Sequence, residues 1–149
     1  MLKNNIFLAL LLLFFGFGNS FSQDFQILPD KVIYGKGTFK QEQIIGEAKF
    51  VNLSAEKKVY QWYRVKKNLP SSWKVTTCVP GKCYSADKES GTFTLEAGKS
   101  GILDQNFFPN NETGKAEIEL WVYEKNNKSK AMKTLYIADA SDIQSDVNK

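Results

Sequence analysis

The sequence predicts an all-β protein, an antiparallel β-sandwich of about seven to eight strands. Residues 24–138 consist of short apolar or alternating runs separated by turn-forming residues, and no stretch has a convincing helical period. Segment 115–123 alternates cleanly, with apolar side chains on one face and mixed polar and aromatic side chains on the other. That alternation is typical of an antiparallel strand with one solvated face.

Turn signals bound each expected strand. Gly, Pro, Asn and Asp cluster between the runs, because these residues tolerate the backbone angles of tight turns. In segment 59–65 we expect the bulky Trp62 in the core and Arg64 at the edge of the sheet. The expected strands are 31–34, 44–53, 59–65, 73–79, 92–95, 102–108, 115–123 and 132–138. That many short strands in about 115 residues fit an immunoglobulin-like sandwich, with another small β-barrel or a jelly roll as the alternative.

The first 22 residues have the layout of a secretory signal peptide. Lys3 precedes an apolar run over 6–17, and small polar residues lead to an expected cleavage after Ser22. The apolar run is too short for a membrane anchor, which needs roughly 20 residues. We therefore expect one domain over 23–138 and a polar flexible tail over 139–149. This domain would be secreted or periplasmic, with no membrane segment once the signal is cleaved.

The composition excludes several classes of function. The chain has no histidine, which rules out Ser-His-Asp and Cys-His catalysis and metal sites built on imidazole. The formal net charge is +4, but the lysines are spread among acidic residues rather than gathered in a stripe, which argues against nucleic-acid binding. We expect no enzyme activity, no catalytic residue, no metal and no cofactor.

The two cysteines, Cys78 and Cys83, enclose the segment Val-Pro-Gly-Lys. In an exported chain a closely spaced pair predicts a disulfide, and Pro80-Gly81 fits the centre of a type II turn. A structural clamp on this turn is the leading interpretation. The alternative is a thiol–disulfide redox protein, in which Lys82 would lower the pKa of the neighbouring thiol.

Four residues of segment 115–123 form the candidate binding surface: Glu117, Glu119, Trp121 and Tyr123. They share one face, and aromatic residues concentrate the energy of protein interfaces. The loops 66–72 and 109–114 are the second choice. Trp73 is expected to pack against the core beside the disulfide. The leading function is binding or assembly at the cell envelope with a protein or envelope component as partner, and a carbohydrate-binding module is a further alternative.

An ordered set of landmarks carries a family resemblance: Trp62, Leu69-Pro70-Ser71-Ser72-Trp73, Cys78, Cys83-Tyr84, Leu95-Glu96-Ala97-Gly98, Phe107-Phe108-Pro109-Asn110 and Gly114. The set resembles small secreted immunoglobulin-like modules of bacterial cell-envelope proteins, over residues 25–138. The resemblance implies a module rather than an activity. Such modules often accompany a type IX secretion sorting tail, which is not recognisable after residue 138, so a periplasmic or freely secreted product is expected.

Overall fold

The computed structural model describes residues 23–140, so the expected signal peptide and residues 141–149 lie outside the described part of the chain. This part forms twelve strands and one short 3-10 helix. In chain order they are β1 (Phe25–Leu28), β2 (Val32–Lys36), β3 (Ile44–Gly46), β4 (Lys49–Asn52), β5 (Lys58–Asn68), β6 (Lys74–Val79), β7 (Lys82–Tyr84), β8 (Ser90–Leu95), β9 (Ser100–Ile102), β10 (Asp104–Phe108), β11 (Gly114–Glu124), η2 (Lys128–Lys130) and β12 (Met132–Ala140).

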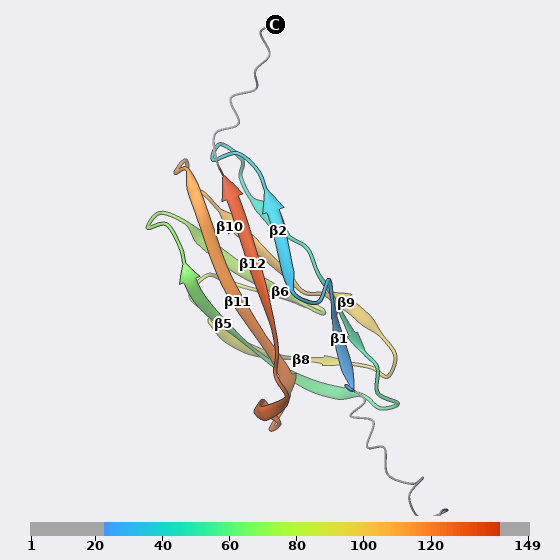
Figure 1. Ribbon diagram of the computed structural model, residues 1–149. Helices are drawn as coiled ribbons and strands as arrows, with labels where there is room; N and C mark the ends of the chain where they lie inside the picture. The colour runs from blue at the N-terminus through green and yellow to red at the C-terminus, as the bar shows by residue number, and fades with distance from the viewer. Residues whose placement is uncertain (1–22, 141–149) are drawn as a thin grey trace, which may run out of the picture.

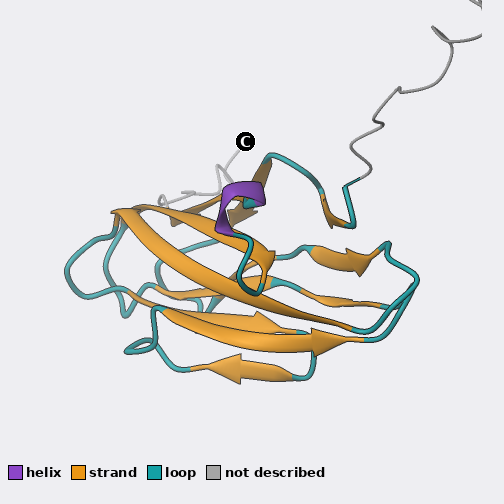
Figure 2. Cartoon of the chain, turned by 90° about the horizontal axis from the view of Figure 1, so that it is seen from below, coloured by secondary structure: helices purple, strands orange, loops and turns teal. Residues whose placement is uncertain are grey.

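The strands stack in two layers (Figures 1 and 2). One layer is a five-stranded sheet in the order β2-β12-β11-β5-β8, and a four-stranded sheet in the order β3-β10-β6-β7 packs against it. A three-stranded sheet, β1-β4-β9, continues from the strands β3 and β10. All neighbours are antiparallel except β2 and β12, which run parallel. The predicted all-β sandwich is confirmed.

Two expected strands, 44–53 and 102–108, are each divided in two. The divisions lie opposite one another, where the Leu103 N–H donates to the Ala48 carbonyl at 2.8 Å and the Ala48 N–H donates to Asp104 Oδ1 at 2.9 Å. Both segments pass from one sheet to another at this crossing, where Leu103 is fully buried. These two divisions, together with the short strands β1 and β7, raise the number of strands from the expected eight to twelve.

Aromatic side chains fill one end of the core. Phe50 of β4 packs edge-on against Tyr60 of β5 and Phe93 of β8, with ring centroids 4.6 and 5.0 Å apart. Phe25 of β1 stacks on Phe50 at 5.3 Å. Trp62 is fully buried, as predicted. Rings arranged edge to face contribute beyond the area that they bury, so this cluster holds the small three-stranded sheet on the five-stranded one.

Several expected boundaries shift. β5 continues to Asn68, three residues into the expected loop 66–72, and β12 continues to Ala140, so the first two residues of the expected tail are strand. The added pairing explains the second shift, because Asp139 of β12 faces Lys36 of β2. The prediction that Arg64 lies at the sheet edge is wrong, since only 1% of the residue is exposed and it lies between the layers.

Candidate functional site

The cysteines form the predicted disulfide. Cys78 and Cys83 face each other across the β6–β7 hairpin, with Cα atoms 3.9 Å apart. Gly81 has a φ of +81°, the left-handed conformation that the third position of a type II turn requires. Cys78 is buried and Cys83 is exposed. The bond therefore clamps a hairpin at the edge of the four-stranded sheet, and whether it also exchanges electrons stays a prediction.

The four predicted contact residues do lie on one face of β11, the outer face of the five-stranded sheet. Glu117, Glu119 and Trp121 are half-buried, because neighbouring strands flank them on both sides. Tyr123 is only 7% exposed, so it offers little area to a partner. The geometry brings the predicted residues together, but it leaves Trp121 as the main aromatic surface among them.

Polar neighbours hold Trp121 in place. Its indole N–H donates to Glu119 Oε2 at 2.6 Å, and Glu119 also pairs with the Lys67 ammonium at 3.2 Å. The Lys133 ammonium lies 3.9 Å from the centre of the indole ring, within range of a cation–π interaction. The hydrogen bond from Trp121 is the main cause that lowers the pKa of Glu119. Trp121 is therefore fixed in one orientation, with its N–H group already bonded.

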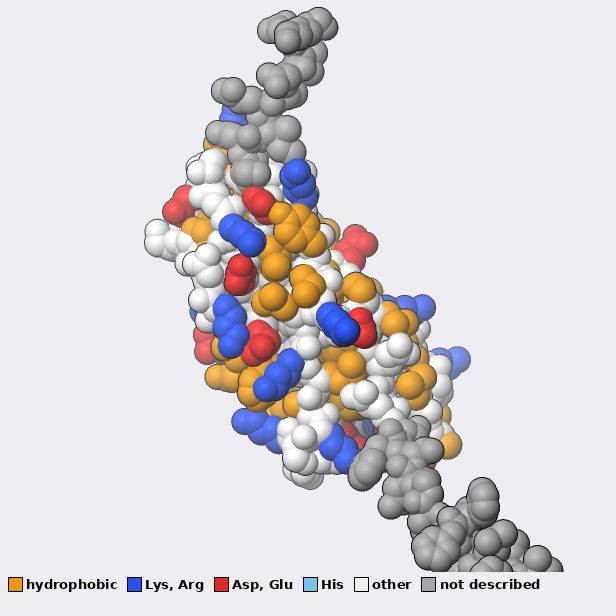
Figure 3. All heavy atoms as spheres, viewed as in Figure 1, with side chains coloured by type: hydrophobic (Ala, Val, Ile, Leu, Met, Phe, Trp, Pro, Cys, Tyr) orange, Lys and Arg blue, Asp and Glu red, His pale blue; other side chains and the backbone are white. Residues whose placement is uncertain are grey.

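The larger apolar exposure on this face comes from residues that the sequence analysis did not single out. Val32 and Tyr34 of β2 are 50% and 55% exposed, and Tyr63 of β5 is 41% exposed. Val32 faces Leu135 of β12, and Tyr34 faces Ile137. Figure 3 shows apolar side chains gathered over β2 and β12, interspersed with lysine and acidic side chains. We call the surface formed by Val32, Tyr34, Tyr63 and Trp121 the outer-face patch.

The two loops of second choice meet at one end of the sandwich. The Ser72 N–H donates to Glu112 Oε2 at 3.0 Å, and the Ser72 hydroxyl also bonds to that carboxylate. The Trp73 indole N–H donates to the Glu112 carbonyl at 2.9 Å. These bonds from Ser72 lower the pKa of Glu112. The packing of Trp73 in the core is confirmed, with 3% exposed. Its predicted place beside the disulfide is wrong, because Trp73 immediately precedes β6 and Cys78 lies near the far end of that strand.

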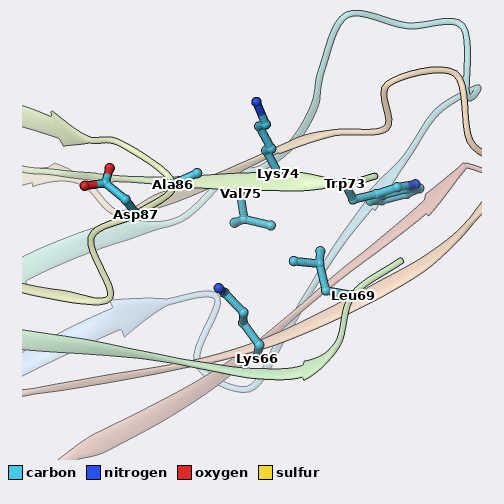
Figure 4. A pocket seen from close by; sticks show the side chains of 7 residues that line it. All are labelled: Lys66, Leu69, Trp73, Lys74, Val75, Ala86 and Asp87. Atoms are coloured by element: carbon cyan, nitrogen blue, oxygen red, sulfur yellow. The ribbon is translucent and has the colours of Figure 1, made fainter. Parts of the chain in front are cut away.

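A groove of about 440 Å³ opens between β5 and β6. Figure 4 shows Lys66, Leu69 and Val75 pointing toward the gap, while Lys74 points away from it. The groove is lined by Lys66, Leu69, Trp73, Lys74, Val75, Ala86 and Asp87. It therefore combines an apolar floor with a charged rim, at a point where the two sheets are not joined.

Arg64 lies behind this groove and ties its walls together. Its guanidinium donates to the Val75 carbonyl at 2.7 Å and to the Ala86 and Lys88 carbonyls, both at 2.8 Å. A fourth bond, 3.1 Å long, reaches the Thr77 hydroxyl. All four acceptors are neutral, and burial lowers the pKa of the guanidinium. The guanidinium therefore donates its hydrogen bonds to neutral groups, while the nearby carboxylates of Glu89 and Asp87 partly offset the cost of burying its charge.

Metal binding and membrane crossing would each require a particular arrangement of the described residues. Between residues 23 and 140, no group of three or more acidic, cysteine or histidine side chains is placed to hold a metal ion. Within that same range, no helix has the length and apolar character needed to cross a membrane.

Comparison with known proteins identifies the fold. No model of a known protein family matches the chain, and no curated protein sequence matches it. Among solved structures, the chain is similar to the N-terminal domain of PorA, with a TM-score of 0.55 and 10% identity over 76% of this chain and 90% of that one. It is also similar to part of a family 123 glycoside hydrolase from Clostridium perfringens, with a TM-score of 0.52 and 9% identity over 76% of this chain and 23% of the hydrolase.

A further similar structure is the class 5 fimbriae chaperone CfaA, with a TM-score of 0.49 and 13% identity over 79% of this chain and 57% of that one. At such identities a likeness shows the fold and nothing more, and the fold is carried by the first two structures. The predicted immunoglobulin-like β-sandwich architecture is confirmed, and the resemblance to such modules holds at the level of the fold.

Proposed function

We propose that this chain is an exported, non-enzymatic binding module that takes part in protein assembly at the bacterial cell envelope. Its partner is a protein, and the contact surface is the outer-face patch on the five-stranded sheet. The observation that carries this proposal is the exposure of Val32, Tyr34 and Tyr63 on a face rimmed by charged side chains. Apolar side chains gathered on one face and surrounded by polar ones are typical of protein-interaction surfaces.

The patch is suited to binding because much of it is already rigid. Trp121 is held by Glu119 and Lys133, and the Tyr34 hydroxyl donates to Asp139 Oδ2 at 2.8 Å. Side chains that are fixed before binding lose less conformational entropy when a partner arrives. Aromatic residues with few rotatable bonds are the usual anchors of such interfaces.

The experiment places a photo-crosslinking amino acid at Tyr63 of the full chain, in the bacterium that produces it. We expect one discrete adduct with another envelope protein after illumination. The matched control carries the same crosslinker at Thr76, which is half-buried on the outer face of the other sheet. A second variant adds Tyr34→Ala to the Tyr63 crosslinker, and we expect it to reduce the adduct about tenfold.

Equal adducts from Tyr63 and Thr76 would refute the proposed surface. An adduct of twice the mass of the chain would show that the partner is a second copy of this chain rather than another protein. Loss of the adduct in the Tyr34→Ala variant, with unchanged thermal unfolding, would support the proposal, because the loss could not then be attributed to misfolding.

A further inference from the structure

We propose that the groove between β5 and β6 binds an extended peptide segment that carries a carboxylate side chain, and that this segment adds to the free edge of β5 as an extra strand. The groove is a different surface from the outer-face patch. Its failure as a peptide site would therefore leave the proposed function untouched.

The first argument is that the strand edges beside the groove are only partly paired. On this side of the sandwich, β7 pairs with β6 from Thr77 to Val79, and β8 pairs with β5 from Lys58 to Tyr63. Beyond those pairs, among the described residues, no strand lies beside residues 64–68 of β5 or 74–76 of β6 on this side. Free strand edges are the sites at which extended peptides add to sheets.

The backbone of Lys66 faces the vacant side. The Arg64 N–H donates toward this side, to the Glu89 carbonyl at 2.7 Å. In an antiparallel strand the N–H and C=O groups of every second residue face the same neighbour, so those of Lys66 follow the direction of Arg64. The irregularity in the β5–β11 pairing comes only after Lys66, which still faces Ile118. An added strand would thus find a backbone donor and acceptor in the place where β8 stops.

The floor of the groove determines which side chains an added strand should carry. Leu69 and Val75 point toward the gap, and buried Trp73 lies beside them (Figure 4). Lys66 points toward the same gap from β5. Alternate residues of a strand face the same side, so an apolar residue and a carboxylate separated by one residue would meet this floor and Lys66 together.

Charge favours the carboxylate over a cation. Lys66 points into the groove, and the one acidic residue that lines it, Asp87, already bonds to the Ser85 hydroxyl. The guanidinium of Arg64 adds a positive charge directly behind the groove, where it has neutral acceptors. Glu89 pairs with Lys66 at 3.0 Å, but both side chains are half exposed, and a peptide carboxylate can join or displace this weak pair.

The test uses a blocked seven-residue peptide, Gly-Thr-Asp-Thr-Val-Thr-Gly, and the same peptide with lysine in place of aspartate. Binding is followed by amide and indole chemical shifts in two-dimensional NMR of the 15N-labelled protein. We expect the acidic peptide to shift the amides of residues 64–68 and the Trp73 indole, and to bind about fivefold tighter than the lysine peptide. In the Lys66→Glu variant the preference should reverse.

Matched controls separate a local contact from the general effect of charge. Lys74→Glu makes the same charge change on a lining residue that points away from the gap, so we expect it to keep the acidic preference. A peptide that is N-methylated at its three central residues keeps the same side chains but cannot donate a backbone N–H to β5 in either strand direction, and it should bind at least tenfold more weakly.

Three results would overturn the proposal: equal binding of both peptides, shifts confined to the outer-face patch, or no shift at millimolar peptide. A concentration-dependent dimer whose interface shifts the amides of residues 64–68 without peptide would also overturn it, because the edge would then pair with a second copy. Lys66→Gln, which removes the charge without reversing it, guards against a folding defect. It should unfold like the wild type and lose the preference.

Discussion

The two ends of β6 are held by different means, and the comparison shows which kind of contact organises this fold. At one end the disulfide joins Cys78 to Cys83, five positions further along the chain. At the other end Trp73 and Ser72 bond to Glu112, 39 and 40 positions away. Between them, Arg64 ties the middle of β6 to β5 and to the turn before β8. The covalent bond closes a local loop, whereas the polar contacts join segments that only the fold brings together.

The largest loss of stability should come from removing Arg64, which connects β5 to the middle of β6. We expect Arg64→Met to lower the free energy of unfolding by about 3 kcal/mol, because four acceptors lose their donor and buried carbonyls are left without a partner. Urea unfolding followed by tryptophan fluorescence measures the change. Lys67→Met on the same strand is the control, and as an exposed residue it should change stability by no more than about 0.5 kcal/mol. Equal unfolding midpoints for the two variants would contradict the role assigned to Arg64.

A smaller effect is expected at the covalent end. Replacing both cysteines, as Cys78→Ala with Cys83→Ala, should lower the free energy of unfolding by about 2 kcal/mol, since closing so short a loop removes little entropy from the unfolded chain. The same urea experiment measures it. If the bond is structural, its reduction potential should also lie below about −300 mV. A markedly less negative potential, with a loss of function in the double variant, would favour the redox alternative.

The smallest effect is expected at the Ser72–Glu112 contact, and it depends on pH. The bonds from Ser72 lower the pKa of Glu112 in the folded state, so this stabilisation is complete above the unfolded pKa and is lost as the pH falls through the folded value. Between about pH 5 and about pH 2, the urea midpoint of the wild type should fall more than that of Glu112→Gln. Asp87 and Glu119 also have lowered pKa values, and both proteins share their contribution. Parallel pH curves would show that Glu112 contributes nothing.

The sequence allowed prediction of the elements whose side-chain pattern is local. β11 alternates strictly, and the bulk of Trp62 identified the inner face of β5. The disulfide followed from the spacing of Cys78 and Cys83. β1 was not anticipated, because a four-residue strand that follows a presumed cleavage site and precedes Pro29 offers too short a pattern. The exchange of strands between sheets at Ala48 and Leu103 depends on a contact between distant segments, which no local pattern reports.

The candidate site was predictable only in part, for the same reason. The outward face of β11 was foreseen, but the exposure of Val32 and Tyr34 depends on β2 lying parallel to β12. The burial of Arg64 depends on carbonyl groups from two separate segments, β6 and the turn before β8. A charged side chain in an alternating strand is normally expected to be exposed to solvent. The groups that allow Arg64 to be buried are backbone carbonyls, and their positions cannot be predicted from residue types.

The parallel pairing of β2 with β12 has a mechanical consequence. The ends of the described chain leave the sandwich at opposite ends of its long axis (Figure 1). Tension along the polypeptide would draw β2 backward from its start and β12 forward from its finish, so the two strands would be sheared lengthwise. The hydrogen bonds between them would then carry the load simultaneously rather than opening one after another, so this pair of strands would resist stretching best along that axis.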